Sequence, residues 1–302
     1  MRGRFAPSPT GSLHLGNLRT ALVSWLQVHT AGGEWLVRME DLDRVTASVA
    51  HEAVQLADLA ALGMHPDGLV VRQSERFDLY RDAIAIMRTA GRVYECFCTR
   101  REIRDAASAP HGDLPEGAYP GTCRSLTAVR RAEHLAAGRT PALRLRAEGE
   151  RFTIDDLIAG RYEGGTDDVV LQRNDGVPAY NLAVVVDDAM QGVTHVVRGD
   201  DLLSSTPRQR LLQQLLGLPE PTYAHVPLVL APDGSRLAKR HGAVTLADLA
   251  ARGVTAPHVL ALLGESLGLC AADDEVTATD LAQHFDLVTV PRQPWSLRAD
   301  QL

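Results

Sequence analysis

The first 25 residues constrain the fold more than any other stretch, because they put a turn and a helix directly behind a short buried strand. Phe5 ends an apolar segment. The prolines and the glycine of residues 7–11 cannot continue a strand, since proline removes a backbone donor and glycine favours a turn. After Gly16, apolar side chains recur at helical spacing as far as Trp25. The sequence therefore predicts a strand, a turn and a helix with one buried face.

The start of this helix is a candidate phosphate site. The free N–H groups and the positive dipole end of a helix N-terminus attract anions. Gly16 has no side chain, so a nucleotide can lie against the backbone there, and His14 can donate a hydrogen bond to a phosphoryl oxygen. The alternative is an ordinary strand, turn and helix in which the histidine of HLGN occurs by chance. Four residues do not distinguish the two, so other motifs of the chain are needed to choose between them.

The composition excludes several classes of protein. The chain has 302 residues, of which 45% are hydrophobic and 23% charged, as expected for a globular protein of two or three domains. No apolar run approaches the roughly 20 residues that a membrane span needs, and the N-terminus lacks a signal-peptide pattern. We therefore expect a cytoplasmic protein without a membrane segment. The net charge of -7 argues against indiscriminate nucleic-acid binding, although a local basic groove is compatible with it.

Strand and helix patterns alternate in the first part of the chain. Two further strands are expected at residues 35–39 and 69–72, and two further helices at residues 48–62 and 77–90. This order predicts a parallel sheet with helical crossovers.

Three carboxylates, Glu40, Asp41 and Asp43, follow the strand at residues 35–39. Ligands of open α/β sheets bind at the carboxyl ends of the strands, so Glu40 is placed to meet a substrate amine. The alternative is an acidic cluster at the N-terminus of a helix, which needs no ligand.

The second half of the chain also contains strand patterns, at residues 168–173, 180–188, 193–198 and 225–230, with a helix at 206–216. The consecutive valines at 184–186 suit a central strand that is buried on both faces, with Asp187 and Asp188 at its end. The next strand ends in Arg198, so charged residues again gather at strand ends.

A cysteine group in residues 93–145 is a candidate zinc site. Cys96 and Cys98 are one residue apart, and Cys123 follows later, which gives three thiolate ligands for a tetrahedral ion. Tyr119 and His111 are the candidates for the fourth ligand, and three cysteines with a histidine are the commoner set. Free buried thiols are the alternative.

A loop at residues 233–242 contains several cations, among them Lys239, the only lysine of the chain. Arginine serves everywhere else. The ammonium of lysine is compact and sits on a flexible stem, so it can stay in contact with a phosphate that moves during a reaction, which a planar guanidinium does less well. Lys239 is therefore a candidate catalytic residue.

Taken together, these motifs resemble those of the class I aminoacyl-tRNA synthetases. RFAPSPTGSLHLGN and the downstream RLAKR are similar to the paired HIGH and KMSKS signatures, although Arg236 and Ala238 replace a lysine and a serine of the second one. MEDLD and YNLAVVVDD followed by VRGDD resemble the glutamyl branch. The resemblance covers about residues 1–265. It implies an α/β, Rossmann-type catalytic domain with a zinc-containing insertion and a small helical C-terminal part, without an anticodon-binding domain.

The implied domain organisation has four parts. The first half of the Rossmann domain would be residues 1–92, the insertion with the zinc knuckle 93–165, the second half with the KMSKS-like loop 166–242, and the helical C-terminal segment 243–302.

Within the branch, the knuckle CFC…YPGTCR resembles that of short paralogues, the glutamyl-queuosine tRNA(Asp) synthetases. The resemblance implies ATP-dependent activation of glutamate, with Mg²⁺ accompanying ATP, and transfer of glutamate to queuosine in the anticodon loop of tRNA(Asp). We expect the chain to act as a monomer. The resemblance also implies Tyr119 as the fourth ligand of one structural zinc ion. A truncated glutamyl-tRNA synthetase, a small-molecule nucleotidyltransferase and a non-catalytic binding protein are the alternatives.

The resemblance also implies roles for individual residues. His14, Gly16 and Lys239 would be catalytic. The glutamate pocket would consist of Arg4, Ala6, Ser8, Glu40, Tyr180 and Arg198. The ATP site would consist of His14, Gly16, Asn17, Arg236 and Lys239, and the metal ligands would be Cys96, Cys98, Tyr119 and Cys123.

Overall fold

The computed structural model describes residues 1–99, 101–103, 118–231, 233–235 and 244–297. Three residues that the sequence singles out, His111, Arg236 and Lys239, lie outside the described residues. Within the described part of the chain, none of the helices combines the length and the apolar character that a membrane span requires.

A parallel sheet forms the centre of the molecule. Among the described residues it has five strands in the order β10-β9-β1-β2-β3. Their bounds are β1 Arg2–Phe5, β2 Glu34–Met39, β3 Val71–Arg72, β9 His195–Gly199 and β10 Thr222–Val226. Helix α1 (Leu15–Thr30) connects β1 to β2, and α2 (Val49–Ala61) connects β2 to β3. The predicted parallel sheet with helical crossovers is confirmed.

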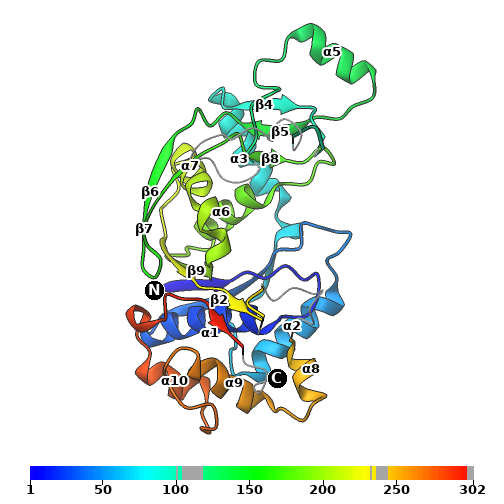
Figure 1. Ribbon diagram of the computed structural model, residues 1–302. Helices are drawn as coiled ribbons and strands as arrows, with labels where there is room; N and C mark the ends of the chain where they lie inside the picture. Colours follow the sequence, from blue (N-terminus) through cyan, green and yellow to red (C-terminus); the bar gives the residue numbers. More distant parts are fainter. Residues whose placement is uncertain (100, 104–117, 232, 236–243, 298–302) are drawn as a thin grey trace.

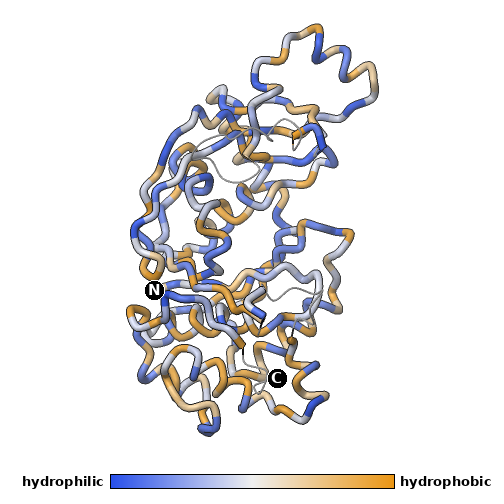
Figure 2. The backbone as a smooth tube through the Cα atoms, in the orientation of Figure 1, coloured by the Kyte–Doolittle hydropathy of each residue, from blue (hydrophilic) through white to orange (hydrophobic). Residues whose placement is uncertain are grey.

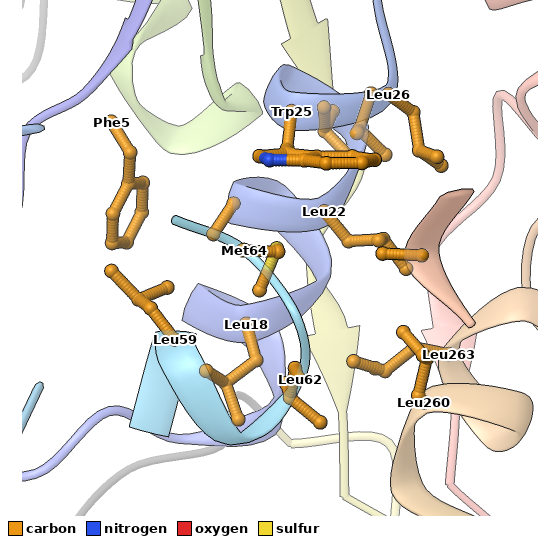
Figure 3. Close-up of a cluster of buried hydrophobic side chains, with 14 of the residues drawn as sticks. Phe5, Leu18, Leu22, Trp25, Leu26, Leu59, Leu62, Met64, Leu260 and Leu263 are labelled. Carbon is orange, nitrogen blue, oxygen red and sulfur yellow. The ribbon is translucent and has the colours of Figure 1, made fainter. Parts of the chain in front are cut away.

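One face of the sheet packs on α1, and the C-terminal helices lie behind it (Figure 1). Their bounds are α8 Leu246–Ala250, α9 Ala256–Glu265 and α10 Ala278–His284. Figure 3 shows the core of this layer, where Leu18, Leu22 and Leu26 of α1 lie in one cluster with Leu260 and Leu263 of α9. Burying each leucine contributes about 1.5–3 kcal/mol. This packing fixes α1, and with it the turn that precedes the helix.

The opposite face of the sheet is covered by α6 (Tyr180–Met190), against which α3 (Phe77–Thr89) and α7 (Thr206–Leu216) pack (Figure 1). The predicted strand at residues 180–188 is therefore wrong. All residues from 182 to 188 are buried, so the helix has no polar face and its valine run looks like a fully buried strand. Asp187 and Asp188 lie near the end of a buried helix instead of at the end of a strand.

The predicted strand at residues 225–230 is two strands. The first, β10, ends at Val226, and the second, β11 (Val229–Leu230), begins after Pro227, which has no N–H to donate to a ladder. β11 pairs in parallel with β12 (Trp295–Ser296). The C-terminal part is thus helical, as predicted, but it also returns a strand to the edge of the cavity described below.

Residues 93–172 contain two antiparallel sheets. One consists of β4 (Val93–Cys96), β5 (Ala142–Leu145) and β8 (Val170–Gln172), and α5 (Ala128–Ala136) projects from it (Figure 1). The other is a hairpin of β6 (Arg151–Asp156) and β7 (Gly160–Gly165), and β6 contacts α7 and β10. The described residues also contain short 3-10 helices, which are η1 Gln73–Glu75, η2 Asp200–Ser205 and η4 Leu287–Thr289. Figure 2 shows hydrophilic residues along much of the hairpin, and hydrophobic and hydrophilic residues mixed on α5.

Candidate active site and metal centre

Because successive side chains of a strand point to opposite faces of the sheet, three buried arginines come to lie on the same face. Gly3 faces α1, because a Cβ there would meet Val28 of α1 at 2.5 Å. Its neighbour Arg4 therefore points to the opposite face, which α6 covers. Arg38 of β2 and Arg198 of β9 lie on this same face, and all three arginines are at least 95% buried. Such charges need partners in the protein.

Asp188 of α6 supplies one partner for two of them. Its Oδ1 accepts from Nε of Arg4 at 3.1 Å and from Nη1 of Arg38 at 2.8 Å. Burial alone would raise the pKa of Asp188, but Arg4 and Arg38 outweigh it, and the pKa is lowered. Asp188 is thus a charged anchor of the two arginines, a role that the sequence reasoning missed. The available signal was a carboxylate directly after a wholly apolar run, where no exposed face exists.

Glu40 and Asp201 are the acids in the lining of the cavity described below, and Glu40 is the one predicted from the sequence. Its backbone N–H donates to the carbonyl of Pro7 at 2.9 Å, and its carboxylate lies 3.4 Å from the Arg38 guanidinium. Burial raises the pKa of Glu40, and Arg38 and Arg4 only partly oppose the shift. A buried carboxylate with one long ion-pair contact is suited to an added cation. Asp41 and Asp43, by contrast, accept hydrogen bonds from Ser74 and Thr46.

One cavity of about 710 Å³ lies at the carboxyl ends of β1, β2 and β9, a size within the ordinary range for small-molecule sites. It brings together every described residue that the sequence predicted for substrate and ATP. Its lining includes Arg4, Ala6, Ser8, His14, Gly16, Asn17, Glu40, Tyr180 and Arg198. Burial raises the pKa of the Tyr180 hydroxyl, so this residue remains a neutral donor at physiological pH. The individual roles of these residues stay predictions, but they share one site.

His14 caps α1 through its ring. Its Nδ1 accepts from the backbone N–H of Asn17 at 3.3 Å, and the Asn17 side chain accepts from the backbone N–H of His14 at 3.2 Å. A ring nitrogen that accepts carries no proton, so the neutral tautomer has its proton on Nε2. Burial lowers the pKa of His14, against the opposing charge of Asp201. The cap therefore leaves one N–H donor on a neutral imidazole at the cavity wall.

Gly16 makes room for this ring. A Cβ on Gly16 would lie 2.9 Å from Cε1 and 3.0 Å from Nδ1 of His14, closer than side chains normally approach. The ring could yield only by giving up its bond to the α1 N-terminus. The glycine is thus required for the conformation of His14 and not only for access to the backbone.

If the chain activates glutamate, as its motifs imply, we expect Gly16→Ala to slow glutamate-dependent pyrophosphate exchange by about 10- to 100-fold, since a shift of ~1 Å near reacting atoms is enough for such a loss. Gly68→Ala is the matched control, because a Cβ there meets only Leu36, at an ordinary 3.7 Å. A wild-type rate in Gly16→Ala would show that His14 does not need its observed conformation.

Gln55 of α2 holds the turn over the cavity. Its side-chain amide donates to the carbonyls of Ser8 at 3.0 Å and Gly11 at 2.7 Å, so one buried side chain fixes both ends of this turn. The sequence reasoning assigned no role to Gln55. A polar residue on the apolar face of the helix at residues 48–62 was the available signal.

The three cysteines of the knuckle converge as predicted. Cys96, Cys98 and Cys123 place their sulfurs within 4.8 Å of one another. The hydroxyl of Tyr119 lies 3.4 Å from Sγ of Cys96 and 3.5 Å from Sγ of Cys98. This donor set of three sulfurs and one phenol oxygen fits a structural zinc ion, for which thiolates are preferred ligands. His111, the other candidate for the fourth ligand, is not among the described residues.

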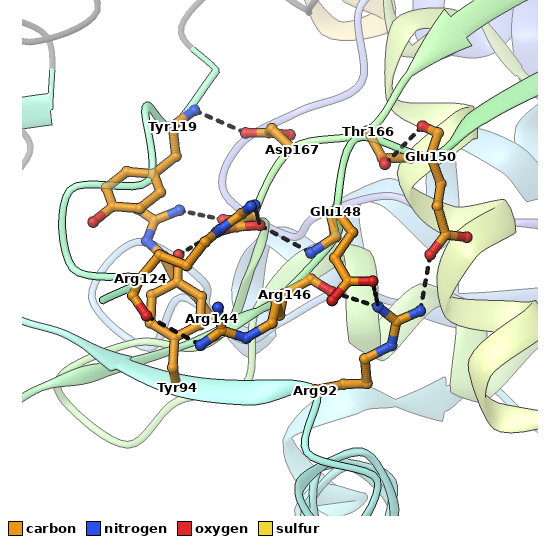
Figure 4. A network of polar contacts seen from close by, with 12 residues as sticks. Arg92, Tyr94, Tyr119, Arg124, Arg144, Arg146, Glu148, Glu150, Thr166 and Asp167 are labelled. Atoms are coloured by element: carbon orange, nitrogen blue, oxygen red, sulfur yellow. Dashed lines mark hydrogen bonds and ion pairs between the residues drawn. The ribbon is translucent and has the colours of Figure 1, made fainter. Parts of the chain in front are cut away.

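Figure 4 shows how Tyr119 is held. Its backbone N–H donates to Asp167 at 2.9 Å, and the guanidinium of Arg144 lies 3.7 Å from the centre of its ring. Arg144 also donates to the carbonyl of Asp168, whose carboxylate pairs with Arg124. Contacts from β5 and from the segment before β8 thus orient the phenol toward the cysteines.

Comparison with known proteins identifies the family of the chain. A sequence model of the family described as tRNA synthetases class I (E and Q), catalytic domain, matches residues 1–302. The glutamyl-Q tRNA(Asp) synthetase of Nocardia farcinica is 60% identical over 295 residues, which cover 98% of this chain and 92% of the relative. That of Symbiobacterium thermophilum is 49% identical over 314 residues, which cover 99% and 97%.

A solved structure gives the same result for the fold. A glutamate tRNA ligase from Elizabethkingia meningosepticum, in complex with its amino acid, matches with a TM-score of 0.83 at 27% identity. The match covers 100% of this chain and 68% of that longer one. The chain therefore belongs to the class I tRNA synthetases of the E and Q group and, within them, to the family of glutamyl-Q tRNA(Asp) synthetases.

Proposed function

We propose that this chain activates glutamate with ATP and transfers the glutamyl group to queuosine in the anticodon loop of tRNA(Asp). The observation that carries the proposal is the cavity, in which a neutral histidine donor, a carboxylate whose side chain is only 9% exposed and two buried arginines lie together. The names of its relatives support the choice of substrates. The proposal also includes action in the cytoplasm, as a monomer, with the four-part domain organisation given above.

Glutamate presents one ammonium and two carboxylates, and the cavity offers complementary charges. Glu40 would bind the ammonium, because a buried carboxylate gains most from a cation. Arg4 and Arg198 would bind the carboxylates, onto which guanidinium groups can fork, with Tyr180 as a further donor. Ser8 and Ala6 would complete the pocket with a hydroxyl and a backbone group.

Activation is a phosphoryl-centred displacement. The glutamate α-carboxylate would attack the α-phosphorus of ATP in line, and pyrophosphate would leave with its charge stabilised by the protein. Catalysis of this kind depends on positioning and on fixed donors. His14, the N-terminus of α1 at Gly16 and Asn17, and the cations Arg236 and Lys239 would supply those donors. Mg²⁺, which this class uses with ATP, would share the phosphate charge.

Transfer then needs only a hydroxyl near the mixed anhydride. A ring hydroxyl of queuosine would attack the activated carbonyl, adenylate would leave, and a glutamyl ester would form. A cis-diol of queuosine and the terminal ribose of a tRNA are similar nucleophiles, so one active site could serve either. The identity of the accepting RNA is therefore the point to test.

The decisive experiment removes the 3′-terminal adenosine from queuosine-containing tRNA(Asp). Glutamate transfer is expected to persist with this RNA and to vanish with the same tRNA lacking queuosine. Pyrophosphate exchange should require glutamate but no RNA. Loss of transfer on removing the adenosine would identify a truncated glutamyl-tRNA synthetase. Exchange that appears only when tRNA(Glu) is added would likewise favour the truncated synthetase. Absence of exchange with every amino acid, with and without RNA, would identify a non-catalytic protein.

We further propose one structural zinc ion per chain, bound by Cys96, Cys98, Cys123 and Tyr119. Tyr119→Phe is expected to weaken zinc retention by at least about 10-fold against a chromophoric chelator, since even outer contacts of metal sites matter by that much. His111→Ala and the control Cys270→Ser should retain the ion as the wild type does. Loss of zinc in His111→Ala with retention in Tyr119→Phe would make His111 the ligand.

A further inference from the structure

Arg198 takes part in a second network, whose other residues do not line the cavity. Nε of Arg198 donates to Nε2 of His225 in β10 at 3.0 Å, and the two residues are adjacent partners in the β9–β10 register. Nδ1 of His225 lies 2.6 Å from Oδ2 of Asp156, at the end of β6. His225 and Asp156 side chains are fully buried. Neither His225 nor Asp156 is among the residues proposed to bind substrate, ATP or metal.

The bonds in this network fix one protonation state. Arg198 can only donate, so Nε2 of His225 must accept, and the proton of the neutral ring lies on Nδ1, facing Asp156. Burial lowers the pKa of His225, and the positive charge of Arg198 adds to the shift, while Asp156 opposes it. Asp156 has a lowered pKa, because its bond to His225 and backbone donors outweigh its burial. An ionised Asp156 beside a neutral His225 satisfies these bonds, and the hydroxyl of Thr206, 3.3 Å from Nε2 of His225, can donate to the same acceptor.

The same contacts determine which donors of Arg198 remain. Its Nη1 donates to Gln209 at 2.7 Å, and its Nη2 donates to Thr206 at 2.8 Å. Among the described residues, three of the five N–H groups of a guanidinium are thus engaged, and one is left on each terminal nitrogen. A carboxylate can accept from the two terminal nitrogens of one guanidinium in a bidentate way. Arg198 lines the cavity, where such a ligand would lie.

We infer that Asp156 and His225 are positioning residues that select the His225 tautomer and thereby aim the two remaining N–H groups of Arg198 at a substrate carboxylate. This inference rests on the proposed function, in which Arg198 binds glutamate. It assigns a role in substrate binding to the β6–β7 hairpin, which lies outside the central sheet and contributes no residue to the lining of the cavity.

Asp156→Asn is the sharpest test. Oδ1 of Asp156 accepts from the backbone N–H groups of Ile158 at 3.0 Å, Ala159 at 2.7 Å and His225 at 3.0 Å. These three bonds would hold the asparagine oxygen in the same place, so its NH₂ group would face Nδ1 of His225. The ring proton would then move to Nε2, where it would face the Nε–H of Arg198.

Two opposed donors would displace Arg198. We expect the KM for glutamate in pyrophosphate exchange to rise by about 10- to 100-fold, the value of one charged hydrogen bond. The KM for ATP should stay unchanged, and kcat should change by less than about threefold, because ground-state binding is what is lost. A merely destabilised fold would instead reduce the active fraction, and hence kcat, with both KM values intact.

His225→Gln provides the rescue. Its amide oxygen can accept from Arg198 without any choice of tautomer, so the KM for glutamate should stay within about threefold of the wild type. Asp156→Asn should then add little in this background. The inference is overturned if Asp156→Asn leaves the glutamate KM unchanged, or if its effect is the same in both backgrounds.

Calorimetry of glutamate binding separates this inference from the proposed function. Wild-type binding without pyrophosphate exchange would contradict the function alone. Equal binding by the wild type and Asp156→Asn would contradict the positioning role alone. A wild type that does not bind glutamate would overturn both.

Discussion

Replacing His14 with asparagine is expected to slow glutamate activation by about 100- to 1000-fold, the loss typical of removing one fixed donor from a developing anion. The fold should stay intact, because asparagine is as good an N-cap as any residue and can still accept from the N–H of Asn17. What disappears is the N–H at Nε2, the only donor of a neutral ring whose Nδ1 is committed to α1. Glutamate-dependent pyrophosphate exchange and a urea unfolding curve measure the two effects.

His14→Ala is the matched variant that separates the cap from the chemistry. It should slow activation as much as His14→Asn does, and it should also lower the free energy of unfolding by about 1 kcal/mol through loss of the cap. Near-normal exchange in His14→Asn would exclude His14 as the donor to the phosphates. The remaining candidates would then be the backbone N–H groups of α1 and the cations Arg236 and Lys239.

Asp188→Asn is expected to lower the free energy of unfolding by about 3–5 kcal/mol, the usual cost of removing one partner of a buried ion pair. Asp188 accepts from both Arg4 and Arg38, and an amide of the same shape cannot neutralise either charge. Arg38 keeps Glu40 at 3.4 Å and Asp187 at 3.7 Å, so most of the loss should arise at Arg4. Denaturant unfolding at pH 7 measures it.

The effect has a defined pH window. The pKa of Asp188 is lowered in the folded protein, so its contribution is fully present above the unfolded value of about 3.9 and is lost as the pH falls through the folded value. The difference between wild type and variant should therefore shrink only below about pH 4. Asp175→Asn is the control, because its pair with Arg173 is exposed and should contribute less than about 1 kcal/mol. A loss that small at Asp188 would mean that water solvates Arg4.

Local sequence was sufficient for the turn before α1 and for the open backbone at Gly16, since turns are made by atoms a few positions apart. The sequence pointed to His14 as a phosphate donor, and the structure added that its ring caps α1. Glu40 followed from strand order, because parallel strands end at one edge of the sheet. The knuckle cysteines followed from their spacing and the known preference of zinc for thiolates.

Only the tertiary structure showed which residues pair with the buried charges and that residues 180–188 form a helix. The sequence predicts a strand at residues 180–188, because a run of buried valines shows no periodicity whether it forms a helix or a strand. Packing on all sides, which only the folded chain supplies, made it α6. The strand prediction also places Asp188 at the end of a strand. In the structure Asp188 lies on α6, against the face of the sheet from which Arg4 of β1 and Arg38 of β2 project.

The sequence by itself determined the strand, turn and helix at the N-terminus, the parallel sheet and the residues that gather at its edge, because short-range sterics and side-chain alternation act within each segment. Only the tertiary structure determined how the buried charges pair. Arg4 donates to Asp188, from which it is separated by 184 positions in the sequence. His225 contacts Asp156 across a separation of 69 positions. Such pairs are set by sheet register and helix packing, which bring distant charges out of water together, and a buried charge is stable only where its partner arrives with it.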